Sequence, residues 1–264
     1  MDFKNKVVWI TGASSGIGKA LAIKLSNCNT RLILSARNKI KLEEVKLLCE
    51  NSNKIKILSL DLEDFVSLQH KVTEAISLFG VIHVLVNNGG ISQRSLAKET
   101  NLSVDKRIMN INYLGTIALT KGLLPHFIEN GGGQFVVTSS IVGKIGTPLR
   151  SSYAASKHAL HGFYDSLRAE THADNISITI ICPGFVNTDV SKNALTGDGS
   201  PQQKMDTATA NGIEPERFAK LMAKAIYNKK EEVNIAGAKE KSGTYVKRFF
   251  PKLLSIMIRK LRVT

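Results

Sequence analysis

Residues 6–18 read Lys-Val-Val-Trp-Ile-Thr-Gly-Ala-Ser-Ser-Gly-Ile-Gly, a short apolar run that leads directly into a glycine-rich turn. Residues 19–27 then have helical periodicity. This order predicts a dinucleotide site, in which Gly12, Gly16 and Gly18 let the backbone approach a pyrophosphate and the helix amides face the phosphates. The spacing Gly-x-x-x-Gly-x-Gly differs from the commoner fingerprint, and a glycine turn without a ligand is the alternative.

Strand and helix patterns keep alternating along the chain. We expect further strands at residues 31–35, 55–59, 83–86, 134–138 and 176–181, with helical segments at 39–51, near 65, at 103–129 and at 153–172. The alternation predicts an α/β fold, a Rossmann-like doubly wound parallel sheet in a single domain. Its ligand crevice would lie at the carboxyl ends of the strands, where the glycine turn falls.

The end of the second strand bears on the choice between NAD and NADP. Sites that select NAD place an acid there for the ribose 2′-hydroxyl, whereas sites for NADP have a neutral residue and a nearby arginine. The sequence here is Ser35-Ala36-Arg37, which favours NADP over NAD, because Arg37 would bind the 2′-phosphate by charge-assisted hydrogen bonds. A solvated Arg37 that begins the next helix is the alternative, since Ser14 and Ser15 supply no second cation.

Two further strand ends offer polar contacts to a cofactor. Asp61 and Leu62 follow the third strand, and the Asp61 carboxylate would accept a hydrogen bond from the adenine amino group. Capping of the helix that begins near Phe65 is the alternative role of Asp61. The fourth strand ends in residues 87–90, Asn-Asn-Gly-Gly, a small polar turn in which Asn88 and Gly89 would lie against the cofactor.

A phenol and an ammonium stand four residues apart in residues 152–157, Ser-Tyr-Ala-Ala-Ser-Lys. Four residues are about one helical turn, so Tyr153 and Lys157 share a helix face. A nearby ammonium lowers the pKa of a phenol from about 10, which makes the tyrosine a usable proton donor and acceptor near neutrality. On its own, the same spacing also fits an ordinary surface pair.

Taken together, these features resemble the short-chain dehydrogenase/reductase family, over nearly the whole chain. Ser140 stands thirteen residues before Tyr153, as the family spacing requires. The residues that carry the resemblance are Thr11 to Gly18, Asp61, Asn87 to Gly90, Asn112, Ser140, Tyr153, Lys157 and the Pro183-Gly184 turn. The family usually has Asn-Asn-Ala-Gly where this chain has glycine at 89, a change that should cost about 1 kcal/mol at most.

The resemblance implies a hydride transfer between a nicotinamide and an alcohol or carbonyl. Tyr153 would exchange the proton with the carbonyl oxygen, and Ser140 would form a hydrogen bond with that oxygen. Lys157 would hold the nicotinamide ribose and lower the pKa of the tyrosine, while Asn112 would anchor a water that links Lys157 to solvent. The other expected cofactor contacts are Gly12, Ser14, Ser15, Gly16, Ile17, Gly18, Pro183, Gly184, Val186 and Thr188, the last at the nicotinamide carboxamide.

Two segments are expected to enclose the substrate. Residues 187–212 are rich in Ser, Thr, Gly, Asn and Gln and would form a lid that is mobile without substrate. Residues 91–95, Ile-Ser-Gln-Arg-Ser, would form the opposite wall, so the predicted substrate contacts are Gln93, Ser140 and Tyr153. Residues 87–95 also resemble a branch of the family with membrane-associated members that act on lipid-like carbonyls, which favours a hydrophobic substrate.

The C-terminal stretch carries half of the chain's net charge of +14. Residues 239–264 hold eight basic residues and one acid, a net charge of +7. Pro251 suits a first helical turn, and apolar residues follow at helical spacing at Phe250, Leu253, Leu254, Met257, Ile258 and Leu261. We therefore expect a catalytic domain at residues 1–238 and a basic amphipathic helix within residues 239–264. This helix would lie peripherally on an anionic membrane surface or pack on protein.

Composition narrows the class of protein further. With 264 residues and 43% hydrophobic content, the chain can bury a sizeable core in one domain. It has no uninterrupted apolar run of about 18 residues and no signal-peptide pattern at its start, which predicts a cytoplasmic protein. The three cysteines and six histidines lack disulfide or metal-ligand spacing, so we expect no metal. Nucleic-acid binding is not expected, because no recognition module accompanies the charge.

The sequence therefore predicts an NADP-dependent oxidoreductase that interconverts a carbonyl and an alcohol on a hydrophobic, lipid-like molecule. One alternative is reduction of a 3-ketoacyl group on an acidic acyl carrier, which the basic surface would suit. Another is a membrane-surface scaffold that binds a dinucleotide without turnover. The resemblance also implies a homodimer or homotetramer formed through the helices at residues 103–129 and 151–172.

Overall fold

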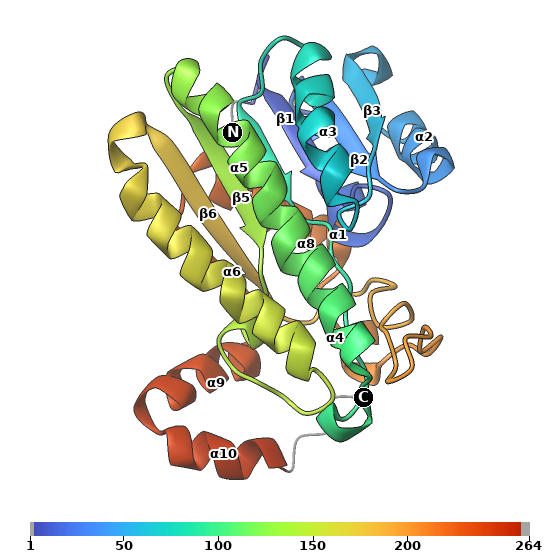
Figure 1. Cartoon of the computed structure of the whole chain (residues 1–264), viewed down its shortest axis with the longest axis vertical. Coiled ribbons are helices and arrows are strands. Elements are labelled where there is room, and N and C mark those ends of the chain that lie inside the picture. The colour runs from blue at the N-terminus through green and yellow to red at the C-terminus, as the bar shows by residue number, and fades with distance from the viewer. Residues whose placement is uncertain (1–2, 260–264) are drawn as a thin grey trace.

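A seven-stranded parallel sheet forms the centre of the computed structural model, which describes residues 3–259. The strands are β1 (Val7–Thr11), β2 (Arg31–Ala36), β3 (Ile55–Ser59), β4 (Val84–Asn87), β5 (Gly133–Thr138), β6 (Ile176–Pro183) and β7 (Glu232–Ile235). Their order across the sheet is β3-β2-β1-β4-β5-β6-β7 (Figure 1). From β1 to β3 the strands are added toward one edge of the sheet, and from β4 to β7 toward the other, so the order reverses between β1 and β4. A doubly wound fold binds its ligand at this point. The predicted Rossmann-like fold is confirmed.

Helices cover both faces of this sheet. One face carries α3, α5 and α6, which lie toward the viewer in Figure 1, and the other carries α1, α2 and α8. The bounds of the helices are α1 (Gly16–Ser26), α2 (Lys39–Leu47), α3 (Phe65–Ser77), α4 (Leu102–Met109), α5 (Gly115–Glu129), α6 (Ser151–Glu170), α7 (Thr207–Ala210), α8 (Pro215–Tyr227), α9 (Ala238–Phe249) and α10 (Pro251–Arg259). The sheet is thus the middle of three layers, and its carboxyl edge stays open.

Alternate residues of the strands enter two separate hydrophobic clusters. In β1, Val7 and Trp9 pack under α3 and α5, whereas Val8 and Ile10 pack under α1 and α8. Successive side chains of a strand point to opposite faces, so a strand covered on both sides needs a continuous apolar run. Such runs made β1, β2 and β4 recognisable in the sequence.

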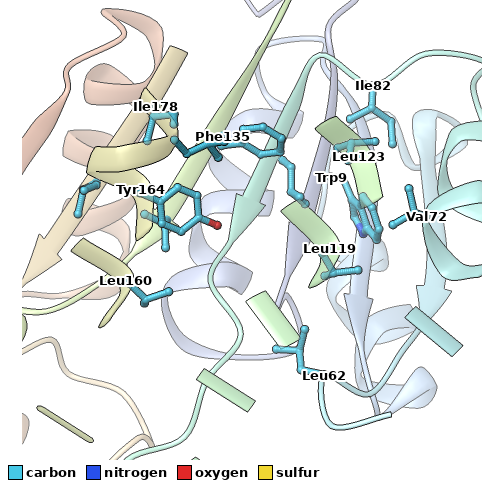
Figure 2. Packing of buried hydrophobic residues seen from close by; sticks show 14 of the residues in the cluster. Trp9, Leu62, Val72, Ile82, Leu119, Leu123, Phe135, Leu160, Tyr164 and Ile178 are labelled. Carbon is cyan, nitrogen blue, oxygen red and sulfur yellow. The ribbon is translucent and has the colours of Figure 1, made fainter. Parts of the chain in front are cut away.

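The cluster beneath α3, α5 and α6 also buries polar atoms that find partners (Figure 2). Trp9 donates its indole N–H to the hydroxyl of Ser35 at 2.8 Å. The Tyr164 hydroxyl lies 2.6 Å from that of Thr120 and accepts a hydrogen bond from the Asn87 amide at 3.0 Å. Because buried polar groups are costly when unpaired, these bonds fix where β4 ends and the cleft begins.

The helix predicted at residues 103–129 is interrupted. A π-helical segment, Asn110–Leu114, separates α4 from α5. Such segments are rare and often lie at functional sites. The one-turn change of hydrogen bonding leaves helical periodicity almost intact, so the sequence pattern did not reveal it.

The edge of the sheet beyond β6 was not predicted. Of the four residues of β7, Ile235 alone is buried, so Glu232 to Ile235 has no apolar run that would mark a strand. The helix α8 that precedes β7 buries Phe218 and Met222 against α1. Strand β6 also continues to Pro183, beyond the predicted end at Ile181.

The C-terminal stretch folds as two helices. Besides the predicted helix, seen here as α10, residues Ala238–Phe249 form α9 (Figure 1). Leu254 of α10 is buried in the main cluster with Ile258 packed against it, whereas Phe250, Leu253 and Met257 are at least half exposed. The helix therefore packs on the domain with one side only. Of the predicted helix, Leu261 and the residues around it lie outside the described part of the chain.

Among residues 3–259, no helix is both long enough and apolar enough to cross a membrane.

Candidate active site

The ends of β1 to β6 converge on one cavity of about 690 Å³ at the carboxyl edge of the sheet. Residues from the turn after β1, from the first half of α6 and from the segment after β6 line its walls. Parallel strands bring their carboxyl ends to the same edge, so residues far apart in the sequence meet there. The predicted ligand crevice is this cavity.

The glycine turn lies at the floor of the cavity. Gly12 and Gly16 have φ angles of +63° and +52°, values that suit glycine. A Cβ atom at Gly18 would lie 2.3 Å from the carbonyl oxygen of Gly12, so Gly18 closes the turn from behind and does not line the cavity. Ser14, Ser15 and Ile17 line it, and α1 begins at Gly16 with its amides facing the opening.

Two cationic side chains line the cavity near the end of β2, where the sequence analysis named only Arg37. Arg37 lines the cavity directly after β2, as predicted. Lys41 lines it too, one turn into α2, whose start is fixed by the Asn38 side chain accepting the Lys41 amide at 3.0 Å. Lys41 lies in the first turn of α2, close to Arg37 in the sequence, and this proximity was the signal that sequence reasoning missed.

The Asp61 carboxylate lines the cavity after β3. It accepts the backbone N–H of Glu63 at 3.1 Å, which orients the carboxylate toward the cleft. The cap of α3 is a different residue, Asp64, whose side chain accepts the Ser67 amide at 3.3 Å. The alternative role of Asp61 as the helix cap is therefore wrong. Leu62 follows in the cavity wall.

The turn after β4 is tied to the glycine turn. The Asn88 amide group donates to the carbonyl oxygens of Thr11 and Gly12 at 3.2 and 3.3 Å, and the Thr11 hydroxyl accepts the N–H groups of Asn88 and Gly89. A Cβ atom at position 89 would lie 2.8 Å from a methyl of Leu62. That contact gives a physical reason for glycine where the family usually has alanine.

Tyr153 and Ser140 lie next to each other in the cavity wall. Ser140 follows β5, and its hydroxyl accepts the Val142 amide at 3.3 Å and donates to the Pro183 carbonyl at 3.4 Å. Burial raises the pKa of the Tyr153 phenol, while the charge of Arg150, a hydrogen bond with Ser140 and the charge of Arg94 lower it. Arg150 and Arg94 were not among the predicted site residues.

Lys157 lies beside the phenol ring. Its ammonium donates to the Thr138 carbonyl at 2.7 Å and lies 5.8 Å from the centre of the Tyr153 ring. The charges that lower the pKa of Tyr153 include those of Arg150 and Arg94, which the spacing did not predict. Burial lowers the pKa of Lys157 itself to about 8.

Asn112 lies in the π-helical segment, behind the cavity wall. Its carbonyl oxygen accepts the Ile91 amide at 2.8 Å, and its NH₂ group donates to the Ile91 carbonyl at 2.9 Å and to the Ser156 hydroxyl at 3.0 Å. Both hydrogens of the amide are therefore engaged, with one lone pair of the oxygen left for a water. The π-helical turn gives Asn112 this reach to Ile91.

The segment after β6 supplies the remaining predicted contacts. Pro183, Gly184, Val186 and Thr188 all line the cavity. The Gly184 amide donates to the Ile235 carbonyl at 3.0 Å, so the unpredicted strand β7 holds this turn. Thr188 lies across the cavity floor, its methyl 3.1 Å from where a Cβ of Gly16 would be.

Gln93 is placed differently from its predicted role as a substrate contact. Its side chain is fully buried and does not line the cavity. The carbonyl oxygen accepts the backbone N–H groups of Ser152 and Tyr153 at 2.9 and 3.3 Å. Gln93 therefore caps the helix that carries the tyrosine, a role that depends on a contact between residues 60 positions apart and leaves no local pattern.

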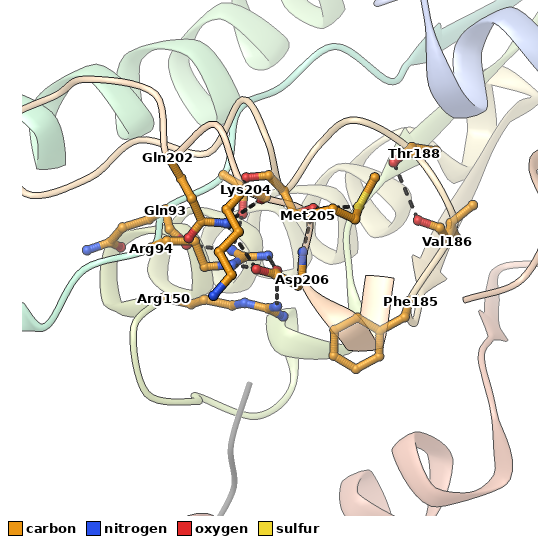
Figure 3. Close-up of polar contacts among 12 residues, drawn as sticks. Gln93, Arg94, Arg150, Phe185, Val186, Thr188, Gln202, Lys204, Met205 and Asp206 are labelled. Atoms are coloured by element: carbon orange, nitrogen blue, oxygen red, sulfur yellow. Dashed lines mark hydrogen bonds and ion pairs between the residues drawn. The ribbon is translucent and has the colours of Figure 1, made fainter. Parts of the chain in front are cut away.

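The predicted lid, residues 187–212, is hydrogen-bonded to the opposite wall. Leu195 exchanges backbone hydrogen bonds of 2.8 and 2.9 Å with Arg94 and Ser92. Asp206 is buried and accepts two hydrogen bonds from the Arg94 guanidinium (Figure 3). The loop is thus held to residues 92–94 by the backbone of Leu195 and by the Asp206 carboxylate.

A group with metal-ligand chemistry lies outside the cleft, although the sequence spacing suggested none. The side chains of His161, Cys182 and Glu232 have ligand atoms within 4.8 Å of one another. Burial raises the pKa of the Cys182 thiol to about 12, and the Lys144 ammonium pairs with Glu232. A protonated thiol and a competing ammonium weaken this trio as a cation site.

The fold and the cleft define a class before any comparison. Tyr153 and Ser140 line one cavity with the glycine turn, so a group able to exchange protons lies beside a turn of the kind that binds dinucleotides. This is the arrangement of a dinucleotide-dependent oxidoreductase.

Comparison with known proteins narrows the class to a family. The family model for short chain dehydrogenases matches residues 6–198. The dehydrogenase/reductase SDR family protein 7-like of Anopheles gambiae is 44% identical over 261 residues, 97% of this chain and 82% of the relative. The SDR family member 7B of Xenopus tropicalis is 37% identical over 257 residues, 95% and 83% of the two chains. The chain belongs to the short-chain dehydrogenase/reductase family.

A solved structure shares the fold. A short chain dehydrogenase/reductase from Burkholderia phymatum, crystallised in complex with NAD, superposes with a TM-score of 0.84 over 96% of each chain. Its sequence is 20% identical, so this likeness speaks for the fold alone.

Proposed function

We propose that this protein uses NADP to interconvert a carbonyl and an alcohol on a hydrophobic small molecule. The observation that carries the proposal is that Tyr153, Ser140 and Lys157 line the same cavity as the glycine turn. One bound dinucleotide and one substrate can therefore both reach the acid/base group.

The cavity fits a phosphorylated dinucleotide. At the floor, a Cβ atom on Gly12 would lie 2.7 Å from the Cα of Gly89, so glycine there keeps the turn low enough for a pyrophosphate. At the far end, Arg37 and Lys41 form a cationic pair suited to a ribose 2′-phosphate, and cations there favour NADP over NAD. The bound nucleotide would supply or accept the hydride.

The proton is handled by the residues of this chain. In reduction, the Tyr153 hydroxyl gives its proton to the carbonyl oxygen, and Ser140 donates a hydrogen bond to the same oxygen. In oxidation, the phenolate takes the hydroxyl proton back. Lys157, with a pKa of about 8, can gain and lose a proton near neutrality, and Asn112 keeps a lone pair for a water beside it. This route would return protons from solvent to Tyr153.

The substrate end of the cavity has apolar side chains beside the polar residues Ser92, Arg107, Asp189 and Asn193. Ile91 lines one wall, and Val190, Leu195 and Pro201 line it from the loop 187–212. Apolar walls with a few placed polar groups select substrates by burial of apolar surface. A hydrophobic ketone, aldehyde or secondary alcohol is the substrate class that this lining favours over a polar one.

Three measurements test this proposal. Binding titrations with NADPH and NADH should give a tighter complex with NADPH. A panel of hydrophobic and polar ketones, aldehydes and alcohols should then show oxidation or reduction of the nicotinamide mainly with hydrophobic members. Ser140→Ala should lower the turnover about 100-fold or more while leaving NADPH affinity unchanged, because the serine acts on the reacting oxygen. Equal turnover in this variant would contradict the assigned chemistry.

We also propose that residues 239–264, the predicted C-terminal extension, contact a membrane surface peripherally. Phe250, just before α10, and Leu253 and Met257 on α10 are at least half exposed, close to basic residues. Replacing these three by Ser, Gln and Gln spares the buried Leu254 and should reduce sedimentation with anionic vesicles. Val66→Gln, at a 93% exposed position on α3, is the matched control. Unchanged sedimentation of the triple variant would end this proposal.

A homodimer or homotetramer is proposed as the assembly. The helices concerned are α5 and α6, and Leu114 and Ile128 expose apolar surface on or beside α5. Analytical ultracentrifugation should show a dimer or tetramer that Ile128→Glu weakens. A monomer at all concentrations would contradict it.

A further inference from the structure

Two buried arginines share one carboxylate next to the substrate loop (Figure 3). Arg94 donates from Nε and Nη2 to Oδ2 of Asp206 at 2.7 and 2.5 Å, and both side chains are almost fully buried. The Arg150 guanidinium approaches the same oxygen at 3.6 Å. The group therefore keeps an excess of positive charge in a region of low dielectric.

The burial of the Arg150 guanidinium is energetically unfavourable. Within the described part of the chain, its Nε and Nη2 atoms are buried and have no hydrogen-bond partner. Its guanidinium lies over the Phe185 ring, 5.2 Å from the centre, which offsets part of the cost. A buried cation with unused donors is uncommon and calls for a reason other than stability.

Arg150 stands three residues before Tyr153, at the N-cap of α6. An arginine side chain cannot accept the free amides of a helix start, and Gln93 does so instead. The Gln93 NH₂ group is in turn held by the hydroxyls of Ser95, Thr100 and Ser151. The first turn of α6 is thus fixed, and with it the spacing between the guanidinium and the phenol.

The charges of Arg150 and Arg94 act on the pKa of the Tyr153 phenol. Burial raises the pKa of Tyr153, and Arg150 is the first group that opposes this, followed by the hydrogen bond with Ser140 and then Arg94. Asp206 faces the same arginines from the loop. The other charged groups that line the cavity or contact the first turn of α6 are Arg37, Lys41, Asp61, Asp105, Arg107, Lys157 and Asp189.

We propose that Arg150 is a second cation serving the acid/base tyrosine, and that Asp206 of the substrate loop, itself fixed by Arg94, holds it in place. Arg150 acts through Tyr153 and is a positioning residue, since it lies outside the cavity lining. Its guanidinium, whose Nε and Nη2 atoms have no hydrogen-bond partner among the described residues, favours the phenolate over the phenol. Asp206 belongs to the loop 187–212, so this loop and the proton-transfer group form one unit. The inference rests on the proposed acid/base role of Tyr153.

The test is an NMR pH titration of the full chain with isotope-labelled tyrosine rings, with and without NADP. Tyr153→Phe identifies the Tyr153 signal among the five tyrosines. Arg150→Met should raise the midpoint of the Tyr153 titration by about one pH unit, because a cation at short range favours phenolate. Arg150→Lys retains the charge and should move the midpoint less than half as far. Turnover is not needed, so the result is independent of whether the proposed reaction is right.

Arg168→Met is the control, because it removes a cation from the other end of the same helix, where Arg168 pairs with Asp165. Its Tyr153 midpoint should match the wild type, and thermal unfolding verifies that each variant is folded. Equal midpoints in wild type and Arg150→Met would overturn the proposal. Equal shifts in the Met and Lys variants would do so too, by showing a packing effect. A wild-type Tyr153 that stays protonated until the fold is lost would also refute it.

Discussion

The cofactor side and the substrate side of the cleft are built in different ways. On the cofactor side, backbone meets backbone: Gly12, Gly18 and Gly89 approach one another where no side chain would fit. On the substrate side, buried side chains join segments far apart in the sequence, such as Arg94 and Asp206, which are 112 positions apart. A site made of close backbone is damaged by added atoms, whereas a site made of buried charges is damaged by removing one.

Removing the shared carboxylate should have the largest effect on stability. Asp206→Asn leaves Arg94 and Arg150 buried without their counter-ion, which should lower the free energy of unfolding by about 3–5 kcal/mol. Chemical denaturation measures this, and limited proteolysis should then cut within residues 187–212. Asp189→Asn is the control on the same loop, since the Asp189 and Lys192 side chains are 61% and 49% exposed. Equal loss in both variants would remove the distinction between the two sides.

Adding one methyl group to the glycine turn should have the next largest effect. In Gly18→Ala the new Cβ would lie 2.3 Å from the Gly12 carbonyl oxygen, so the turn must shift, at about 1–3 kcal/mol of stability and with weaker nucleotide binding. Gly162→Ala is the matched control, because nothing lies within 4 Å of its Cβ position in α6. That control should gain about 0.5–1 kcal/mol. Normal NADPH binding by Gly18→Ala would speak against the role of the turn.

Removing one positive charge at the end of the cavity proposed for the ribose 2′-phosphate should have the smallest effect. Arg37→Ser removes one of two cations and should weaken NADPH binding about tenfold, the worth of one charge-assisted hydrogen bond. NADH affinity should stay the same, because NADH lacks the 2′-phosphate. Fluorescence titration of both nucleotides measures the ratio. A parallel loss for NADH would mean that Arg37 supports the fold and not the choice of nucleotide.

The same contrast explains what could be predicted. The glycine turn, the parallel sheet and the positions of Arg37 and Asp61 follow from local signals: apolar runs, glycine spacing and strand ends. Lys41 was within reach of the same reasoning, because it lies in the first turn of the helix that begins two residues after Arg37. Local geometry is enough on this side because neighbouring strand ends define it.

The substrate side could not be predicted in this way. Gln93 looked like part of a polar wall, but its amide caps α6 from a distant segment. Arg150 preceded a helix with nothing to mark it as buried, and its burial depends on Asp206 and Phe185. The edge strand β7 lacks an apolar run, and the π-helical turn around Asn112 keeps the periodicity of an ordinary helix. In each case the tertiary contact, and not the local pattern, decides the outcome.

The central claim is that Tyr153 transfers the proton beside a bound dinucleotide. The most direct test is Tyr153→Phe, compared with wild type for turnover of a substrate found in the carbonyl and alcohol panel and for NADPH affinity. Loss of a general acid should lower kcat by about 100- to 10,000-fold, while the NADPH Kd stays within about twofold because the ring and the glycine turn remain. A variant that keeps near-normal kcat with the same NADPH Kd would contradict the account.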